Sequence, residues 1–312
     1  MKLVSVVIPC YRDSATLGRA IRSVLAQTYR PIEVVVVNDC SPETVEIEGC
    51  LTEFPEVRYL RNERNLGLAA TRNAGLVAAT GDCVAFLDAD DEYHPRKIEY
   101  QMCALCPGSA VTCRFQEVLP GDSAPIASIR DADVAVSEVS TVGRLLYRNT
   151  LNGAGLLAPR ELLLKMGGYD ASMRSCEDFD LWLRLLESGV QARRVELPLY
   201  LYYFNPAGLS KNYLNISRWE LEAIGRHMAR RTPEVRRQWR YGFLLAYWLI
   251  KHFFRSERFS SEELRRVTLD NTAILAVWPV IGILVRCIGH RRLLAPPARL
   301  LAFASSTRGG VS

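Results

Sequence analysis

The sequence predicts an α/β fold in which a doubly wound, mostly parallel, Rossmann-like sheet precedes a C-terminal helical region. Three observations carry this prediction. Runs rich in Val and Ile recur through the first ninety residues, and segments with helical periodicity lie between them. The last hundred residues contain two long apolar stretches instead of further strand–helix alternation.

The predicted strands are continuous apolar runs, which is typical of strands covered on both faces by helices. They are LVSVVIP (3–9), IEVVVVND (32–39), the weaker VRYLRN (57–62) and CVAFLDAD (83–90).

Helical periodicity follows the first run, and Ser14 is placed to cap the start of that helix. Its apolar positions are Leu17, Ala20, Ile21, Val24 and Leu25. Residues 68–79 predict a second, alanine-rich helix between two glycines. Ligands of doubly wound sheets bind outside the carboxyl ends of the strands, so the residues that follow each strand form the candidate site.

The net charge of +5 is unevenly distributed along the chain. Residues 1–210 hold 21 Lys and Arg against 27 Asp and Glu, a balance of −6. Residues 211–312 hold 18 against 7, a balance of +11. A basic tail of this kind favours an anionic partner, either a phospholipid surface or a nucleic acid.

Cysteine usage and the start of the chain both predict a cytoplasmic location. Several of the nine cysteines lie in apolar runs, such as Cys83, and are expected to be reduced thiols. Cys103, Cys106 and Cys113 lack a convincing fourth partner for a zinc site. The chain also continues from Met1 directly into a predicted strand, without the basic and apolar segments of a cleavable signal peptide.

Two common phosphate-binding signatures are absent from the sequence. No GxGxxG follows the first run, and no GxxxxGK[ST] occurs anywhere in the chain. Nicotinamide dehydrogenases and P-loop NTPases are therefore poor fits.

Polar or acidic residues follow three of the predicted strands. Pro9 and Tyr11 follow the first, Asn38 and Asp39 the second, and Asp88, Asp90 and Asp91 the last. The carboxyl ends of parallel strands converge on one rim of the sheet, so these residues are expected to meet there.

The LDADD run at 87–91 predicts a divalent-metal site. Four acidic residues lie within five positions from Asp88 to Glu92, and their mutual repulsion is unfavourable unless a cation or hydrogen-bond donors offset it. Carboxylate oxygens suit Mg²⁺ or Mn²⁺, which bind through one or two carboxylates together with substrate phosphates. The alternative is a solvated cap of the helix that starts near Pro95.

Five segments occur in an order that resembles one enzyme family. They are SVVIPCYRD (5–13), VVVNDCS (35–41), NLGLAATRNAGL (65–76), FLDADDEYHP (86–95) and GGYDASMRSCEDFDLWLRL (167–185). Over about residues 3–210 the chain resembles the large family 2 of inverting glycosyltransferases. The resemblance implies the GT-A fold, a nucleotide-sugar donor, and a glycan or lipid-linked acceptor.

The resemblance also implies residues that bind the nucleotide. Asp39 would contact the base, and Pro9 and Tyr11 would line the same pocket. Arg72 lies in the segment that approaches the nucleotide moiety.

The remaining roles concern the metal and the catalytic base. Asp88 and Asp90 match the family's DXD pair: the first meets the ribose and the metal, and the second ligates the Mn²⁺ or Mg²⁺ that bridges the diphosphate. Asp178, in the Glu177–Asp178 pair, matches the base. The metal would stabilise charge on the leaving diphosphate, and the carboxylate would take the proton of the acceptor hydroxyl. The alternative for the acid pair is that it stabilises a helix N-terminus.

Three departures from the family pattern limit what the resemblance implies. Asn38 replaces the first acid of the frequent DDGS segment, although Asp39 remains. Residues 202–205 (YYFN) replace a YRxH-type segment, which puts further diphosphate or metal contacts from that region in doubt. Residues 215–219 (NISRW) lack the Gln of the QxxRW of processive synthases, so we interpret Trp219 as a packing residue and expect one sugar per encounter.

The basic tail contains the most apolar stretches of the chain, residues 241–254 and 273–288. Both are shorter than the ~20 residues of a membrane-spanning helix. The arginines that border them, within residues 236–292, and the neighbouring Trp and Tyr fit helices in a membrane interface. Helices that pack on the catalytic domain are the alternative, while nucleic acid fits less well because the arginines form no polar basic face.

Together these observations predict a catalytic domain over residues 1–212 and a basic, apolar helical region over 213–312. Within the first, nucleotide-sugar binding is assigned to about 1–110 and the acceptor side to about 111–212. The predicted protein is a metal-dependent glycosyltransferase that favours UDP-sugars. It would act in cell-envelope polysaccharide or glycolipid synthesis, in the cytoplasm or peripherally at the inner face of the cell membrane. The alternatives are a non-catalytic nucleotide-sugar-binding or scaffold protein and a nucleotidyltransferase.

Overall fold

The computed structural model describes residues 1–119, 134–147, 149–151, 153–205, 213–232 and 248. The chain divides into two compact units, Met1–Lys211 and Asn212–Ser312, and each is described by itself. The apolar stretches 241–254 and 273–288, apart from Trp248, and their flanking arginines lie outside the described residues.

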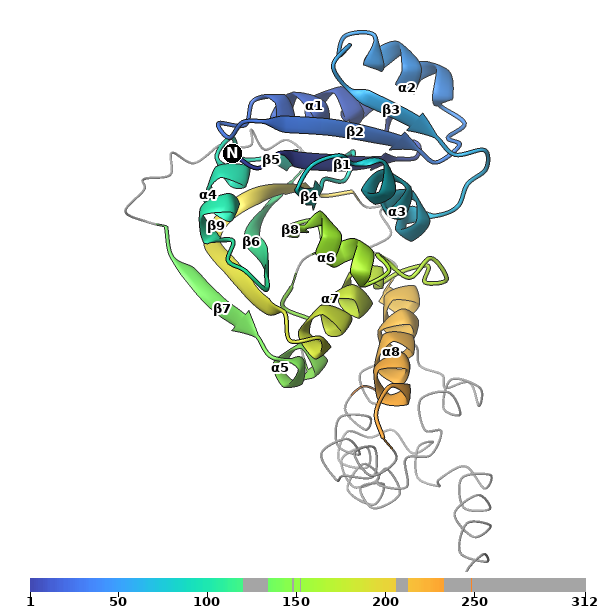
Figure 1. Cartoon of the computed structure of the whole chain (residues 1–312). Helices are drawn as coiled ribbons and strands as arrows, with labels where there is room; N and C mark the ends of the chain where they lie inside the picture. Colours follow the sequence, from blue (N-terminus) through green and yellow to red (C-terminus); the bar gives the residue numbers. More distant parts are fainter. Residues whose placement is uncertain (120–133, 148, 152, 206–212, 233–247, 249–312) are drawn as a thin grey trace, which may run out of the picture. The chain divides into compact units, whose positions relative to one another are not determined.

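The described part of the first unit contains one nine-stranded sheet (Figure 1). Its strands are β1 (Val4–Cys10), β2 (Ile32–Asn38), β3 (Arg58–Arg61), β4 (Cys83–Phe86), β5 (Glu92–Tyr93), β6 (Ser109–Val118), β7 (Val136–Ser140), β8 (Leu157–Pro159) and β9 (Gln191–Tyr203). They are ordered β3-β2-β1-β4-β8-β6-β9-β5, and β7 pairs with β9.

The four strands predicted from the apolar runs are confirmed, and they form a wholly parallel block, β3-β2-β1-β4. The last of them ends earlier than the sequence predicts, at Phe86 instead of Asp90. The chain turns here because the amide of Asp91 donates to the carbonyl of Asp88 (3.1 Å), which takes the acidic residues out of the sheet.

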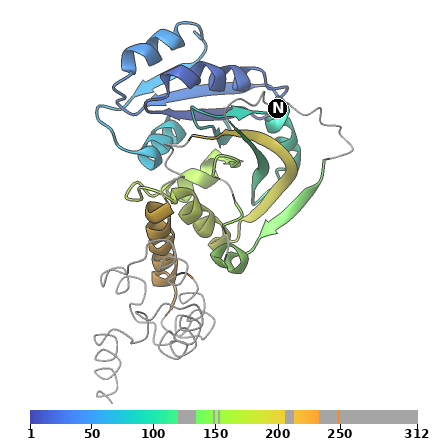
Figure 2. The same ribbon diagram turned by 180° about the vertical axis from the view of Figure 1, so that it is seen from behind.

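Beyond β4 the sheet is mixed, so the prediction of a mostly parallel sheet holds only for the N-terminal block. Strands β8, β5 and β7 run antiparallel to their neighbours, while β6 and β9 pair in parallel. Figure 2 shows β9 as a long curved strand with β6 and β7 beside it. The register of β6 on β9 shifts near Arg114, where an irregularity bends the pair.

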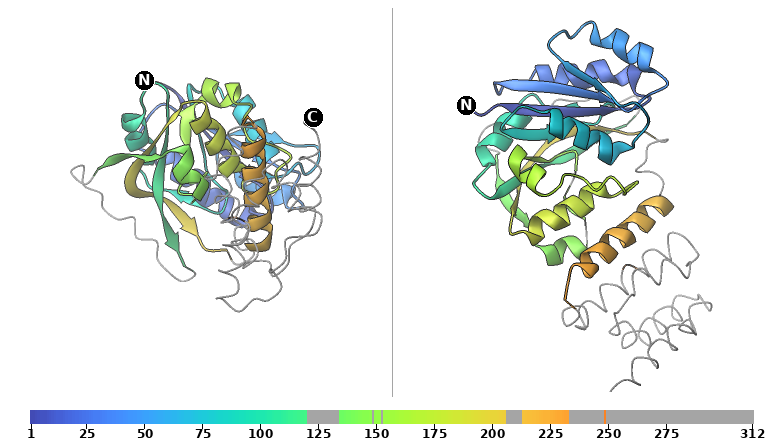
Figure 3. Two further views of the ribbon diagram at one scale, coloured as in Figure 1. Left: turned by 90° about the horizontal axis from the view of Figure 1, so that it is seen from below. Right: turned by 45° about the vertical axis from the view of Figure 1, so that its right-hand side comes forward.

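Helices cover both faces of the parallel block. The helices described in the first unit are α1 (Ser14–Leu25), α2 (Thr44–Leu51), α3 (Leu68–Ala78), α4 (Lys97–Ala104), α5 (Val142–Tyr147), α6 (Arg160–Lys165) and α7 (Glu177–Glu187). Figure 1 shows α1 and α2 on one side of β1 and β2, and α3 on the other. Figure 3 shows α6 and α7 on the same side as α3.

The two predicted helices are confirmed, but the predicted cap is wrong. The N-cap of α1 is Asp13, and the hydroxyl of Ser14 donates instead to Glu43 (2.8 Å). The close approach of α3 to the sheet depends on Gly75, because a Cβ at that position would lie 2.2 Å from Val7 Cγ1. This contact sets the height of α3 over β1.

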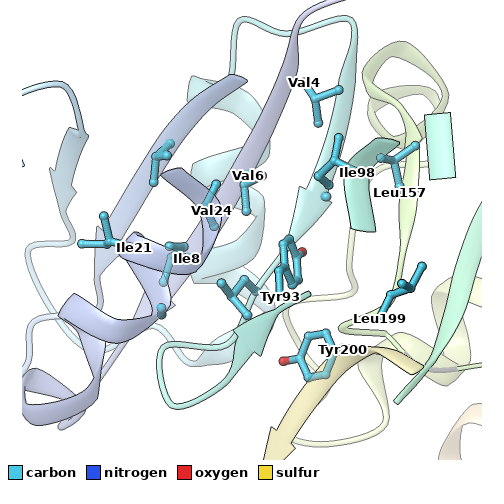
Figure 4. Packing of buried hydrophobic residues seen from close by; sticks show 14 of the residues in the cluster. Val4, Val6, Ile8, Ile21, Val24, Tyr93, Ile98, Leu157, Leu199 and Tyr200 are labelled. Carbon is cyan, nitrogen blue, oxygen red and sulfur yellow. The ribbon is translucent and has the colours of Figure 1, made fainter. Parts of the chain in front are cut away.

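One hydrophobic core joins the parallel block to the mixed half of the sheet. Figure 4 shows side chains from β1, α1, β5, α4, β8 and β9 in a single cluster. The labelled members are Val4, Val6, Ile8, Ile21, Val24, Tyr93, Ile98, Leu157, Leu199 and Tyr200. Burial of each such side chain is worth about 1.5–3 kcal/mol relative to exposure, so the two halves of the sheet stabilise each other.

In the second unit the described helix is α8 (Tyr213–Ala229). It contains the NISRW segment, in which Trp219 Nε1 donates to Asn215 Oδ1 at 3.1 Å. Across the described ranges of both units, none of the helices combines the length and apolar character needed to cross a membrane.

Candidate active site

Asp39, which follows β2, holds the turn that leads into α3. The carboxylate is buried and accepts three hydrogen bonds at 2.8 Å, from the amides of Leu66 and Gly67 and from the side chain of Asn62. Its own amide donates to Cys10 at the end of β1 (3.0 Å). The ends of the first two strands and the start of α3 therefore meet at Asp39.

The other two residues predicted at the base pocket lie on the adjacent strand. Pro9 is buried within β1, and Tyr11 follows the strand with 38% of its surface exposed. Arg12 has a left-handed backbone (φ 62°), and its guanidinium lies 5.4 Å from the Tyr11 ring. Tyr11 is thus an accessible aromatic surface at the rim, next to a strained residue.

Asp88 and Asp90 are half-buried in the turn after β4. Asp88 Oδ1 forms an ion pair with Arg72 (2.7 Å), and its other oxygen has no hydrogen bond within the described ranges. Burial and the nearby charge of Asp88 raise the pKa of Asp90, partly offset by its own backbone amide, by Asn205 and by Arg19. Asn205 comes from the YYFN segment, so this region does reach the acidic turn.

Asp91, the third aspartate of the run, is a buried structural residue that fixes the acidic turn. Its carboxylate accepts from the hydroxyl of Tyr200 (2.5 Å) and from the amide of Tyr203 (2.8 Å), both on β9. Tyr200 also accepts a long hydrogen bond from the amide of Asp88 (3.4 Å). Burial, followed by the charges of Asp88 and Asp90, raises the pKa of Asp91 to about 8.

The opposite side of the turn is held by Arg19 of α1. This guanidinium donates to the carbonyl of Asp90 (2.5 Å), pairs with Glu92 (2.9 Å) and lies 3.6 Å from the ring centre of Tyr203. Tyr203 donates in turn to Glu92 (2.7 Å). The backbone of the DXD pair is therefore fixed from both α1 and β9.

Arg72 joins the acidic turn to the acid pair of α7. The residue is 4% exposed, and its guanidinium contacts Asp88 at 2.7 Å and Glu177 at 2.5 Å. It also lies 5.4 Å from the ring of Tyr169. Both terminal nitrogens thus bind protein carboxylates, and the nucleotide role of Arg72 stays a prediction.

Glu177 and Asp178 open α7. Glu177 is buried, whereas Asp178 is half-buried and accepts from the amides of Gly153 (3.1 Å) and Phe179 (2.8 Å). Cys176, the N-cap, has a left-handed backbone (φ 57°) and no side-chain capping bond. The acids lie in the first helical turn, where negative charge is favourable, so the two interpretations made from the sequence are compatible.

Burial, followed by the adjacent charge of Glu177, raises the pKa of Asp178 to about 6. Arg72 and the amides of Phe179 and Gly153 act in the opposite direction. A carboxyl with a pKa close to neutral can accept and release a proton under physiological conditions.

The carboxylates at the acidic turn determine whether a divalent cation fits there. Within the described ranges no three His, Cys, Asp or Glu side chains converge as a complete metal site. Asp88 and Asp90 nevertheless offer oxygen atoms from one turn, and Mg²⁺ or Mn²⁺ commonly takes its remaining ligands from phosphates and water. The residues therefore fit a metal that binds together with a diphosphate.

The structure thus connects Asp88 with the Glu177–Asp178 pair, because Asp88 and Glu177 both bind Arg72. Asp39, Pro9 and Tyr11 lie at neighbouring strand ends. Sequence reasoning missed Asp91, Tyr200 and Gly153 as positioning residues, because each acts through partners in another segment of the chain. Only the crowding of acids in LDADD hinted that one of them would be buried and bonded.

Comparisons with known proteins show similarity to glycosyltransferases. Residues 5–126 match the family model described as Glycosyl transferase family 2. An uncharacterized glycosyltransferase of Haemophilus influenzae is 32% identical over 186 residues, which are 59% of this chain and 62% of that protein. Succinoglycan biosynthesis protein ExoO of Rhizobium meliloti is 28% identical over 217 residues, 67% of this chain and 62% of ExoO. These matches show similarity to glycosyltransferases, and over residues 5–126 to family 2 in particular.

Solved structures show that the fold is GT-A. The crystal structure of S. aureus TarS 1–349 in complex with UDP has a TM-score of 0.60 at 20% identity, covering 91% of this chain and 83% of that one. Mannosyltransferase PcManGT from Pyrobaculum calidifontis, in complex with GDP-Man and Mn²⁺, has a TM-score of 0.58 at 15% identity, covering 98% and 80%. The chain spans less than two thirds of the length of the first curated relatives, 62% and 31% for two of them.

Proposed function

We propose that this protein is a metal-dependent, inverting glycosyltransferase that moves a sugar from a nucleotide-sugar to a hydroxyl group. The observation that carries the proposal is the contact of Arg72 with both Asp88 and Glu177, at 2.7 and 2.5 Å. It links Asp88, one of the two carboxylates proposed to hold the metal, to the acid pair about ninety residues later. In a displacement the metal would act on the leaving group and the base on the acceptor.

The donor nucleotide would bind at the ends of β1 and β2. Asp39 would contact the base, with Pro9 and Tyr11 beside it. We favour a UDP-sugar, since TarS, which shares the fold, was solved in complex with UDP. Arg72 would supply positive charge behind Asp88.

Asp88 and Asp90 would hold Mn²⁺ or Mg²⁺ against the diphosphate. A bound cation of this kind acts as a Lewis acid and stabilises the charge that develops on the leaving group. Arg19 and Tyr200 keep the turn that carries the two carboxylates in place, so the chain itself presets where the diphosphate lies.

Asp178 would act as the general base, with Glu177 as its neighbour in the acid pair. It takes the proton of the acceptor hydroxyl as the oxygen forms a bond to the anomeric carbon. The bond from that carbon to the phosphate oxygen breaks, and the nucleoside diphosphate leaves with the electron pair. Attack from the face opposite the leaving group inverts the anomeric centre.

For the acceptor we propose a glycan or a lipid-linked hydroxyl in cell-envelope polysaccharide or glycolipid synthesis. Support comes from the similarity to a succinoglycan biosynthesis protein. The enzyme would work in the cytoplasm, at the inner face of the membrane, with residues 236–292 on the lipid surface and 1–212 as the catalytic domain. Equal partitioning with anionic vesicles by the full chain and by a chain truncated at Leu214 would contradict the membrane part.

The function is tested with a panel of nucleotide-sugars. Thermal shift with Mn²⁺ identifies the donor, because a ligand that binds the native state raises its apparent stability. Release of nucleoside diphosphate from that donor is then measured with Mn²⁺ and with a chelator. We expect turnover that the chelator abolishes. Binding without turnover, with several acceptors, would instead identify a non-catalytic nucleotide-sugar-binding protein.

A further inference from the structure

Successive residues of α3 fasten the segment that carries the acid pair. Asn73 makes two hydrogen bonds to the backbone of Tyr169, accepting from its amide (2.8 Å) and donating to its carbonyl (2.7 Å). Arg72, the preceding residue, binds Glu177 at 2.5 Å. The segment from Tyr169 to Glu177 is thus attached to α3 at both ends, about one hundred positions away in the sequence.

The second terminal nitrogen of Arg72 binds a carboxylate on the donor side. This Nη2 atom binds Asp88 at 2.7 Å, in the turn that carries the DXD pair. The Nε atom of Arg72 and the hydroxyl of Tyr169 are buried without hydrogen-bond partners. Buried polar atoms of this kind are costly to leave unsatisfied, so the guanidinium is retained here for its two ion pairs and not for a complete hydrogen-bond network.

We propose that Arg72 is a positioning residue for the catalytic base, which ties the acid pair of α7 to the donor-side carboxylate Asp88. The inference rests on the proposed function, because it assigns Arg72 a part in placing Asp178 opposite the donor. The guanidinium of Arg72 then sets the spacing between Asp88, which acts on the donor side, and Asp178, which acts on the acceptor.

The charge of Arg72 also keeps the base in its active form. The groups that face Asp178 are Glu177 on the same helix, Arg72 on α3 and the hydroxyl of Tyr169, together with the amides of Gly153 and Phe179. Glu177 raises the pKa of Asp178, and Arg72 lowers it. Without Arg72, two adjacent carboxylates would remain poorly compensated, and protons would bind the pair at higher pH.

Arg184 provides a matched control on the same helix. It pairs with Asp180 of the first turn of α7 at 2.7 Å and donates to the carbonyls of Met166 and Gly168. It is therefore a largely buried arginine that holds the same segment, but it binds neither Glu177 nor Asp88.

The first experiment needs no substrate. Melting temperatures of wild type, Arg72→Gln and Arg184→Gln are measured from pH 5.5 to 8. In Arg72→Gln the folded-state pKa values of the acid pair lie above those of the unfolded chain, so stability is retained at low pH and is lost as pH rises through them. We expect the deficit in melting temperature of Arg72→Gln against wild type to grow from pH 5.5 to pH 8, and to grow more steeply than that of Arg184→Gln, which leaves only one carboxylate, Asp180, without its partner. Parallel curves for both variants would overturn the proposal.

The second experiment measures kcat/KM against pH with the donor that wild type uses. We expect the acid limb of Arg72→Gln to lie about one pH unit above that of wild type, as removal of an opposite charge within a few ångströms predicts. Arg184→Gln should keep the wild-type midpoint. Arg72→Lys keeps the positive charge, so the midpoint of its acid limb should match that of wild type. Its kcat should fall, because a lysine cannot bridge two carboxylates in the same way.

The two experiments distinguish the proposed function from the positioning role of Arg72. A wild-type protein without turnover contradicts the proposed function, and the melting curves still decide whether Arg72 governs the acid pair. An active wild type whose Arg72→Gln variant keeps the same acid limb contradicts only the positioning role.

Discussion

Asp39 and Asp178 differ in how the chain holds them. The carboxylate of Asp39 is bound by groups at most 28 positions away, all in the segment that runs from β2 to α3. Asp178 depends on Gly153, 25 positions earlier, and on the Glu177–Arg72 ion pair, which spans 105 positions. The Asp39 carboxylate is thus fixed within one β–α unit, whereas the proposed base is fixed by contacts between distant segments.

The difference concerns the kind of contact as well as its range. Around Asp39 the donors are two backbone amides and one side-chain amide, and the neighbouring strands set their positions. Around the acid pair the decisive contacts are a buried ion pair and a close backbone approach. Substitutions far from the base should therefore affect catalysis more readily than similar changes near the nucleotide side.

The strongest test of the contrast removes the base itself. Asp178→Asn should lower transfer by about 10²–10⁴-fold, the usual contribution of a general base, and leave nucleotide affinity nearly unchanged. Steady-state rates and calorimetric titration with the nucleotide measure the two effects. Asp180→Asn, two residues further along α7, is the control and should keep most turnover. Normal turnover by Asp178→Asn would refute the assignment.

A methyl group at Gly153 should displace the base without touching the donor side. An added Cβ would lie 2.4 Å from Asp178 Cβ, so Asp178 or the loop must move. A shift of about 1 Å can cost about 10²-fold in rate, and we expect a loss of that order in kcat for Gly153→Ala. Gly49→Ala, on α2 with nothing within 4 Å, is the control. Unchanged kcat in Gly153→Ala would show that the loop does not position the base.

On the donor side the main effect should be on stability. Asp39→Ala removes the acceptor of three hydrogen bonds, and unsatisfied buried donors cost about 1–3 kcal/mol each before relaxation and water entry. We expect the free energy of unfolding, measured in urea, to fall by about 2–4 kcal/mol. The exposed neighbour Glu63→Ala should change it by less than about 0.5 kcal/mol. A similar value for both variants would mean that Asp39 does not hold the turn.

The acid pair should also determine the pH dependence of transfer. Asp178 is active as a carboxylate and has a pKa of about 6, so kcat/KM should be level above that pH. Below it, each pH unit should cost about tenfold, because only the unprotonated fraction reacts. A rate profile that stays flat down to pH 4.5, where wild type is still folded, would contradict the assignment.

The smallest expected effect compares backbone strain on the two sides. Cys40 follows Asp39 with φ 53°, and Cys176 precedes Glu177 with φ 57°. Glycine adopts this conformation without the steric cost that other residues have, which partly outweighs its greater freedom in the unfolded chain. We expect Cys40→Gly and Cys176→Gly each to raise the free energy of unfolding by up to about 1 kcal/mol. Destabilisation of either variant would show that its thiol contributes more than the strain costs.

The sequence predicted the parallel block closely, because its strands are apolar runs and its helices have a clear periodicity. It failed where a backbone turn or a pairing depends on a distant partner. The end of β4 was placed four residues late, since the turn is made by a bond between Asp88 and Asp91. Antiparallel β8 has only three residues, too few to show a pattern.

Some residues of the candidate site could likewise be predicted from the sequence, and others could not. Acids at strand ends can be found from sequence, because the parallel topology brings these ends together. The sharing of Arg72 between Asp88 and Glu177 could not be found, since a pattern in the chain carries no information on which distant carboxylate an arginine meets. Nor did any signal show that Gly153 leaves room for Asp178.

A crystal structure of the wild-type protein with Mn²⁺ and UDP tests the central claim most directly. The account predicts the metal about 2.1 Å from oxygen atoms of Asp88 or Asp90 and of the diphosphate. It predicts Asp178 on the side of the diphosphate from which an acceptor can approach, with Arg72 still bound to Glu177. A metal held away from these two aspartates, or Asp178 turned to the opposite side of the protein, would contradict the proposed enzyme.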